Sequence, residues 1–271
     1  MIGALVKMGV PREDAIIVAD VLLASDLYGV RSHGIAHLKM YYDRIKAGLQ
    51  LPVTHWVFVH ETPTTAVMDG GNGMGMVAGY HAMKTAIEKA RANGLGAVAV
   101  RNSSHYGVAG YYTRMAADQG MLGMSLSNAH PSVAPTFGSE PLLGTNPIAI
   151  SAPSDEAFAF TFDAATSVVP RGRLEVAARS GETIPPGWVI RKDGSFPAES
   201  SRLIEEIDRG NAALLPLGGG GEQMGGHKGT VLRPRSRFFR PPSRMEPSSR
   251  NCTIRTSPGI RSLHASGIFF L

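Results

Sequence analysis

The chain has 271 residues, and its 43% apolar content is enough for the hydrophobic core of one large domain or two smaller ones. Its formal charge of +5 is concentrated at one end, because residues 231–271 hold eight Arg and one Glu and the rest is slightly acidic. This distribution gives no support for a nucleic-acid-binding face on the body. With a single cysteine, no membrane-length apolar run and no signal peptide, we expect a cytoplasmic protein without a membrane span.

The first 60 residues predict two helices joined by a polar hinge. A proline followed by acidic residues begins the first helix, at residues 11–28, and its apolar side chains return at helical spacing. A second helix is expected at residues 37–47, where a glycine ends it. The hinge between them, residues 29–34, has no obvious structural need for its Ser-His pair. Two short β-like runs follow at residues 56–60 and 65–68.

Beyond residue 60, predicted helices alternate with strands, and polar clusters follow several of the strands. The expected helices cover residues 77–93 and 111–118, and the expected strands cover residues 97–100, 122–126, 148–151 and 158–162. Residues 101–107 form one polar cluster, and residues 163–167 form another. Enzymes built on sheets place their chemistry at such strand ends, so these clusters are candidate site segments.

Two glycine-rich segments invite a nucleotide-binding interpretation. Residues 73–78 fit the dinucleotide pattern G-x-G-x-x-G/A, but the next strand ends at Arg101 instead of an acidic residue, so a tight turn with close helix packing is preferred. Residues 218–229 contain no G-x-x-x-x-G-K-[ST] pattern, which excludes a P-loop. On composition alone this second segment is a flexible loop, although its glycines allow close backbone approach to a ligand and Lys228 supplies a positive charge.

His33 and His105 are the candidate titrating residues, because each lies in a predicted loop beside Ser and Gly. A single loop histidine is more often incidental, but two in similar surroundings favour function. Zinc binding is disfavoured, since His33 and His37 have no Glu between them as in H-E-x-x-H. A serine hydrolase is a weak alternative, because G-x-S-x-G is absent and adjacent Ser32 and His33 are expected to point in different directions.

Five motifs occur together in order and spacing, and they carry a family resemblance. They are Ser32–His37 with Tyr41, Asn102–Gly107, Gly144–Pro147, Phe162–Ser167 and His227–Gly229. Over residues 1–229 the chain resembles the malate/L-lactate dehydrogenase family, which includes ureidoglycolate dehydrogenase, sulfolactate dehydrogenase and 2,3-diketogulonate reductase. The resemblance implies an α/β (α+β) fold with a family-specific mixed sheet and flanking helices, not a Rossmann fold. It also implies a homodimer and an oxidoreductase that transfers hydride between NAD or NADP and a small 2-hydroxy or 2-oxo acid.

The resemblance assigns roles to particular residues. His105 matches the family's proton acceptor, and its imidazole suits proton transfer in both directions near neutral pH. Positions near the substrate are matched by Ser32, His33, His37 and Tyr41. Positions that hold the nicotinamide dinucleotide are matched by Asn128, Ala129, Asp163, Ala164, Ala165 and Lys228. Many members of the family have Arg where this chain has His37, and only Arg is always charged and bidentate.

The sequence after Gly229 departs from the family abruptly. It becomes rich in Arg, Pro and Ser and has no sustained apolar period until residues 267–271, as either a disordered basic tail or an out-of-frame translation would. We therefore expect residues 1–60 to be an N-terminal helical segment contributing to substrate binding and dimerisation, residues 61–229 an incomplete cofactor-binding domain, and residues 230–271 a disordered tail. On this view the chain is truncated and has little or no turnover. The alternatives are a catalytically dead dimerisation protein and a hydrolase that depends on His105.

Overall fold

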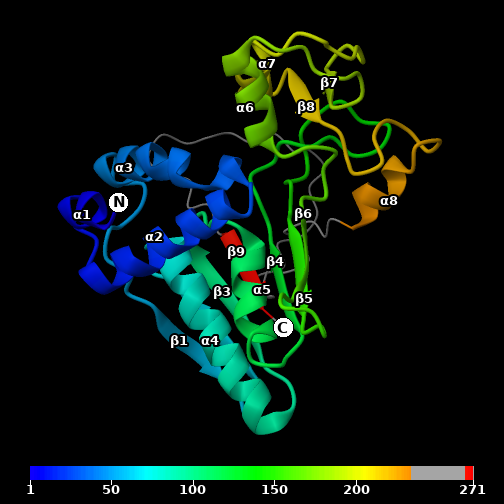
Figure 1. Cartoon of the computed structure of the whole chain (residues 1–271). Coiled ribbons are helices and arrows are strands. Elements are labelled where there is room, and N and C mark those ends of the chain that lie inside the picture. The colour runs from blue at the N-terminus through cyan, green and yellow to red at the C-terminus, as the bar shows by residue number, and fades with distance from the viewer. Residues whose placement is uncertain (233–265, 271) are drawn as a thin grey trace, which may run out of the picture.

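A mixed seven-stranded β-sheet lies at the centre of the molecule (Figure 1). The structure, a computed structural model, describes residues 1–232 and 266–270. The strand order is β1-β2-β3-β9-β4-β5-β6; β2 and β3 are parallel, and the other neighbouring pairs are antiparallel. The strands are Val57–Glu61 (β1), Thr65–Asp69 (β2), Ala97–Ser103 (β3), Gly123–Ser127 (β4), Ile148–Ala152 (β5), Phe160–Ala164 (β6) and Ser266–Phe270 (β9). This confirms the expected mixed sheet and differs from the parallel sheet of a Rossmann fold.

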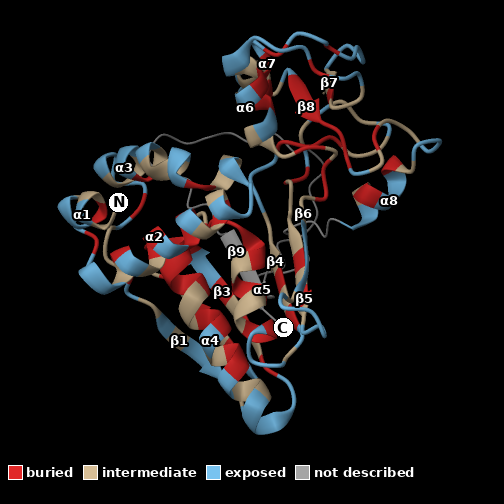
Figure 2. Ribbon diagram, viewed as in Figure 1, coloured by how far each residue is buried: buried red, intermediate tan, exposed pale blue. Residues whose placement is uncertain are grey.

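Two helices cover one face of the sheet. Helix α4 (Gly75–Asn93) packs on β3, and helix α5 (Ala109–Ala117) packs on β4 and β5 (Figure 1). In β3 the period of two places Val98 and Val100 in the core under these helices, and Figure 2 shows the buried residues of both helices. On the other face the apolar residues of β6 are less covered: Phe160 is 59% exposed and Phe162 is 47% exposed.

The glycines at the start of α4 permit close packing against the loop that follows β3. A Cβ added to Gly75 would overlap the carbonyl oxygen of Ser104. The Gly75 N–H donates to Oγ of Ser104 at 2.9 Å, and that hydroxyl donates to the carbonyl of Gly73 at 2.8 Å. The segment 73–78 is therefore a tight turn with close helix packing, as preferred from its sequence.

The N-terminal helices share their hydrophobic core with the sheet. They are α1 (Ile2–Lys7), α2 (Arg12–Leu27), the short 3-10 turns η1 (Arg31–His33) and η2 (Ile35–His37), and α3 (Leu38–Lys46). Helix α2 packs against α4, and its buried residues belong to the same cluster as those of β2 and β3. Asp26 at the end of α2 accepts the backbone N–H of Ile35 at 2.9 Å, which holds the η1–η2 hinge in place.

A second hydrophobic core lies at the top of Figure 1, in a part of the chain for which the sequence predicted no elements. It is formed by α6 (Arg171–Ser180), β7 (Val189–Arg191), α7 (Leu203–Asp208) and β8 (Ala212–Leu214). The last helix of this region is α8 (Gly226–Val231). A hydrogen bond joins it to an earlier loop, because the Thr230 hydroxyl lies 2.8 Å from that of Thr136. The predicted division at residue 60 does not coincide with a boundary between the two cores and remains a prediction about function.

The C-terminal end departs from the expected disorder at residues 266–270, which form β9 between β3 and β4. This is the apolar run that the sequence showed after residue 266. Both β3 and β4 are antiparallel to β9, so these two flanking strands run in the same direction. Each forms backbone hydrogen bonds with β9. The remainder of the expected tail, residues 233–265 and 271, lies outside the described residues. Within residues 1–232 and 266–270, no helix combines the length and the apolar character that crossing a membrane requires.

Candidate active site

Four aromatic and imidazole rings from separate segments meet beside the end of β3. His33 comes from η1, His37 from η2, Tyr41 from α3 and His105 from the loop after β3. The ring centre of His105 lies 5.4 Å from that of His33, 5.2 Å from that of His37 and 6.1 Å from that of Tyr41. The structure thus brings together the predicted proton acceptor and three of the predicted substrate-binding residues; we call them the histidine cluster.

A hydrogen bond of 2.7 Å joins the Tyr41 hydroxyl to Nδ1 of His105. The Gly107 N–H approaches the same nitrogen at 3.3 Å and is the weaker contact. Nε2 of His105 has no hydrogen bond with any residue in the described part of the chain. In the tautomer that carries the ring proton on Nδ1 and donates it to Tyr41, Nε2 has a free lone pair and can accept a proton from a ligand; the Gly107 N–H can donate to Nδ1 only in the other tautomer.

The histidines of the cluster are held in the neutral form. Burial and, to a smaller extent, the nearby charge of His37 lower the pKa of His33 to about 4, against an opposing effect of Glu175. Burial also lowers the pKa of His37. The pKa of His105 lies well below its usual value because of burial and, to a smaller extent, because of His33, His37 and Arg44. Near neutral pH the cluster therefore offers imidazole bases and no imidazolium charge.

Ser32 is hydrogen-bonded to its neighbour, contrary to expectation. Its Oγ lies 3.0 Å from Nδ1 of His33, the next residue of the η1 turn. A Cβ added to Gly172 at the start of α6 would overlap the Cβ of Ser32, so α6 packs closely on this turn. The same helix brings Glu175 within electrostatic range of His33 and His37.

The predicted cofactor residues Asn128 and Ala129 lie in the loop after β4. The Ala129 N–H donates to Oδ1 of Asn146 at 2.9 Å, and the Thr166 hydroxyl donates to the carbonyl of Asn146 at 3.1 Å. These bonds join the ends of β4, β5 and β6 into one polar surface. Sequence analysis assigned no role to Asn146 within its Gly-Thr-Asn-Pro motif, although its positive φ of 33° marks a constrained position.

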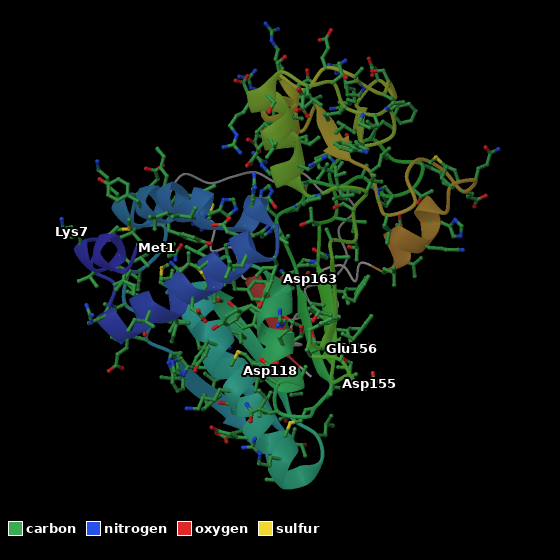
Figure 3. The ribbon with its side chains drawn as sticks, viewed as in Figure 1. Met1, Lys7, Asp118, Asp155, Glu156 and Asp163 are labelled. Atoms are coloured by element: carbon green, nitrogen blue, oxygen red, sulfur yellow. The ribbon has the colours of Figure 1, made fainter. Side chains whose placement is uncertain are left out.

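Asp163, Ala164 and Ala165 follow one another at the end of β6, and Asp163 lies at the start of α5 (Figure 3). Its Oδ2 accepts the Gly110 N–H at 2.6 Å, and burial raises the pKa of this carboxyl group. Lys228 lies in α8, where it is exposed and forms no ion pair with a described residue. The glycines around it pack on one another, since a Cβ on Gly218 would overlap the backbone of Gly225, so the segment is not the loose loop that composition suggests.

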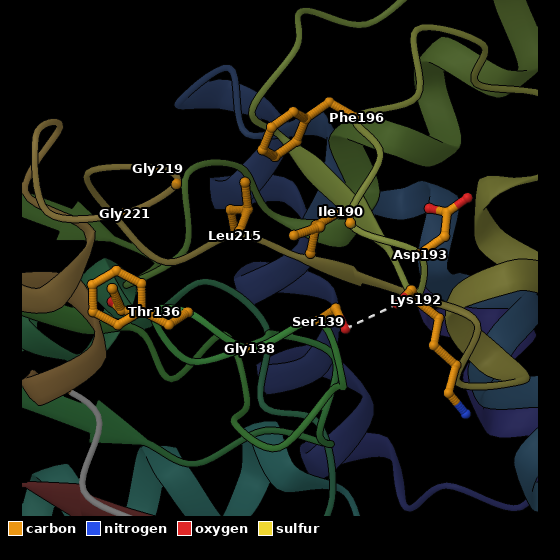
Figure 4. Close-up of a pocket in the computed structure, with 13 residues that line it drawn as sticks. Thr136, Gly138, Ser139, Ile190, Lys192, Asp193, Phe196, Leu215, Gly219 and Gly221 are labelled. Carbon is orange, nitrogen blue, oxygen red and sulfur yellow. Dashed lines mark hydrogen bonds between the residues drawn. The ribbon is translucent and has the colours of Figure 1, made fainter.

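A separate cavity of about 500 Å³ lies beside β7 (Figure 4). It is lined by residues of three segments, 136–139, 190–196 and 215–221, and includes none of the histidine cluster. The Ser139 hydroxyl donates to the Lys192 carbonyl at 3.3 Å across its edge. Among the residues that the structure describes, no group of three or more His, Cys, Asp or Glu is placed to hold a metal ion.

Sequence analysis missed two charged residues beside the cluster. Glu175 lies in a helix that was not predicted, so its position could not be inferred. Arg44 was detectable, because it follows Tyr41 by three residues and His37 by seven and therefore shares their side of α3.

The molecule has a mixed α/β fold, and in the loop after one strand a histidine is hydrogen-bonded to a tyrosine. This arrangement is typical of proteins that exchange a proton with a small ligand. Comparison with known families is more specific: residues 1–233 match the model described as malate/L-lactate dehydrogenase. The chain therefore belongs to the malate/L-lactate dehydrogenase family, which confirms the resemblance inferred from its motifs.

Individual relatives agree with this placement. The chain is 53% identical to a malate dehydrogenase of Pyrococcus abyssi over 86% of its own length and 62% of the relative's. It is 42% identical to an L-sulfolactate dehydrogenase of Methanocaldococcus jannaschii over 81% of its length and 62% of the relative's. The crystal structure of malate dehydrogenase from Entamoeba histolytica superimposes with a TM-score of 0.87 at 42% identity, covering 100% of this chain and 74% of that one. The chain thus spans a little over three-fifths of the length of these curated relatives.

Proposed function

We propose that this chain carries the proton-transfer centre of a nicotinamide-dependent dehydrogenase that interconverts a small 2-hydroxy acid and its 2-oxo acid. The observation that carries the proposal is the Tyr41–His105 hydrogen bond of 2.7 Å inside a cluster of neutral histidines. Several relatives in the same family are named as malate or sulfolactate dehydrogenases, which supports the substrate class.

In the proposed reaction His105 acts at Nε2. During oxidation this nitrogen accepts the hydroxyl proton of the substrate, and during reduction it returns a proton to the carbonyl oxygen. Tyr41 holds the imidazole at Nδ1, which fixes the orientation of the ring and stabilises it when it becomes charged. Because burial lowers the pKa of His105, the ring is neutral near pH 7 and presents a lone pair at Nε2 to the substrate.

The residues around the ends of β4 and β6 and in α8 offer chemistry that suits a nicotinamide dinucleotide. Lys228 provides an exposed cation for a phosphate, and Oδ1 of Asp163 has no hydrogen bond to a described residue and is an acceptor for a ribose hydroxyl. Asn128, Ala129, Ala164 and Ala165 border the same strand ends. When bound, the nicotinamide exchanges hydride with the substrate carbon.

The proposal also covers the choice of cofactor, the oligomeric state, the location in the cell and the substrate-binding residues. A ureidoglycolate dehydrogenase of Escherichia coli is named for NAD⁺ and a sulfolactate dehydrogenase of Chromohalobacter salexigens for NADP⁺, so either cofactor suits the family. Assembly as a homodimer, a cytoplasmic location and substrate binding by Ser32 and His37 are likewise proposed from the resemblance.

The test is a fluorescence titration of the chain with NADH and with NADPH, followed by oxidation of the better-bound cofactor with oxaloacetate and pyruvate. The sequence after Gly229 favoured little or no turnover, but because the Tyr41–His105 pair is assembled in the structure we expect saturable binding and substrate-dependent loss of nicotinamide absorbance. Binding without turnover would support the proposed cofactor site but contradict the proposed catalysis. No saturable binding would favour a catalytically inactive scaffold.

A hydrolase is the second candidate, because Ser32 and His33 are hydrogen-bonded. In a Ser-His-Asp triad, however, the serine bonds Nε2 of the base and the carboxylate bonds Nδ1. Here the serine occupies Nδ1, so the arrangement is reversed. Cofactor-independent hydrolysis of p-nitrophenyl acetate that disappears in Ser32→Ala would support this candidate.

A further inference from the structure

The histidine cluster lacks a permanent positive charge of its own. A small 2-oxo acid brings a carboxylate next to its reacting carbonyl, and a buried carboxylate needs a charged partner. His33 and His37 are held neutral near pH 7, as described above. The cation has to come from a neighbouring residue.

Arg44 meets this requirement by its place in α3. It lies three residues after Tyr41 and seven after His37, so the three side chains share one side of the helix axis. Its charge lowers the pKa of Tyr41 against the larger effect of burial, and it adds a small part to the lowering of the His105 pKa, so the guanidinium lies within electrostatic range of the proton-transfer pair.

Arg44 also has unused hydrogen-bonding capacity. Its Nε is buried and has no hydrogen-bond partner, and no ion pair or hydrogen bond joins the Arg44 side chain to another residue of the described chain. The other cations of α3 are engaged: Lys39 pairs with Asp43, and Lys46 lies 5.7 Å from the ring centre of Tyr42. A buried donor without an acceptor is costly, and an anionic ligand removes that cost.

We propose that the Arg44 guanidinium binds a carboxylate oxygen of the substrate acid beside the Tyr41–His105 pair. This inference rests on the proposed dehydrogenase function and specifies how its substrate is recognised. Arginine suits the role, because it stays charged and presents donors in the planar geometry that a carboxylate accepts.

The competing cation is Arg179 of α6, which also acts electrostatically on His37. It is exposed, and its Nε donates to the carbonyl of Glu175 at 3.2 Å. Arg179 therefore serves as the matched control: it has the same charge and lies near the same cluster, but its Nε is engaged and its side chain is exposed to solvent.

The experiment compares wild type, Arg44→Gln, Arg44→Lys and Arg179→Gln with pyruvate and with its uncharged analogue pyruvamide. For pyruvate, Arg44→Gln should raise KM by about 10- to 100-fold, the usual worth of a hydrogen bond to a charged group, and Arg44→Lys should recover part of the loss. The KM for pyruvamide should stay unchanged, whereas a structural defect would affect both substrates. Arg179→Gln should behave as wild type.

Calorimetric binding of oxalate to the same four proteins tests the inference independently of turnover. Wild type should bind oxalate, and Arg44→Gln should bind it at least ten-fold more weakly, even if no dehydrogenase activity is found and the proposed function fails. Equal oxalate affinity in wild type and Arg44→Gln, or no saturable binding by wild type, would overturn the proposal, as would a KM effect confined to Arg179→Gln.

Discussion

At the scale of single residues, the surroundings of an imidazole decide what it can do. His60 is exposed in β1, whereas His105 is partly buried, bonded to Tyr41 and surrounded by two further imidazoles. Two histidines of one chain thus differ in burial, hydrogen bonding and neighbouring rings. Only the second environment supports general acid–base catalysis.

Replacement of His105 by alanine should lower kcat by roughly 10²- to 10⁴-fold, the usual contribution of a general acid–base residue. The variant loses the proton acceptor while the backbone of the loop after β3 stays held by Ser104. Steady-state oxidation of NAD(P)H with a 2-oxo acid measures the effect, and His60→Ala is the matched control. Turnover within two-fold of wild type would remove His105 from the mechanism.

The neutral His33 should make the protein less stable in acid. Unfolded His33 binds a proton as the pH falls below about 6.5, whereas folded His33 binds one only near pH 4. The unfolded state therefore binds more protons between these values, and the free energy of unfolding falls as the pH is lowered from 6.5 to 4 and is unaffected by this group above 6.5.

Urea denaturation at a series of pH values measures this dependence. We expect His33 to account for about 1–3 kcal/mol of the loss, a range that allows for its partial exposure. His33→Gln, which cannot titrate, should flatten the profile in this interval. An unchanged profile in the variant would show that the acid sensitivity arises elsewhere.

At the scale of elements, the amino end of α4 and the loop after β3 fix each other through a glycine contact. Any side chain at Gly75 would displace the backbone of Ser104 and with it His105. The position of the proposed proton acceptor therefore depends on a residue of another element.

Gly75→Ala should destabilise the protein by about 1–3 kcal/mol and lower kcat, because overpacking shifts the backbone that carries His105. The matched control is Gly3→Ala in α1, where an added Cβ would contact nothing within 4 Å. That change should be neutral or stabilise the protein by up to about 1 kcal/mol. Thermal denaturation and kcat together distinguish the two, and equal stability of both variants would contradict the packing argument.

The sequence predicted elements well where the apolar period was continuous. Helices α2, α4 and α5 and strands β2 to β5 were expected within a few residues of their bounds, and three ring-bearing site residues were placed in the correct segments. The region from α6 to α8 was not predicted, because its elements are short and their apolar residues are fixed by packing around Leu174 and Leu214 instead of by local period. Arg44 was overlooked for a different reason, since its significance appears only once α3 is placed against His105.

At the scale of the whole molecule, the sheet joins segments from opposite ends of the chain. Strand β9 lies between β3 and β4, so its backbone connects the half of the sheet under α4 to the half under α5. Composition favoured disorder for this end, because the basic, proline-rich stretch before it outweighs a short apolar run. The pairing of β9 with a strand on each side depends on the tertiary structure, so it cannot be predicted from the local sequence.

Removal of residues 266–271 should leave backbone groups of β3 and β4 without their strand partner. We expect a lower denaturation midpoint and faster amide hydrogen exchange in both strands, because each lost ladder exposes donors that β9 now pairs. Exchange in β7 and β8, which form a separate sheet, should be unaffected and serves as the internal control. Unchanged protection of β3 and β4 would show that β9 contributes nothing to the sheet in solution.

The Tyr41–His105 hydrogen bond spans 64 positions in the sequence. Contacts between such distant residues close late in folding, since a long loop has to be ordered first. A partial opening that moves α3 away from the loop after β3 would separate the two groups while the strand ladders stay intact, so catalysis would report a local equilibrium rather than global stability. In rising denaturant, turnover should disappear before the far-ultraviolet circular dichroism changes. The difference between the two denaturation midpoints then reports how much less stable the docking of the N-terminal helices is than the fold as a whole.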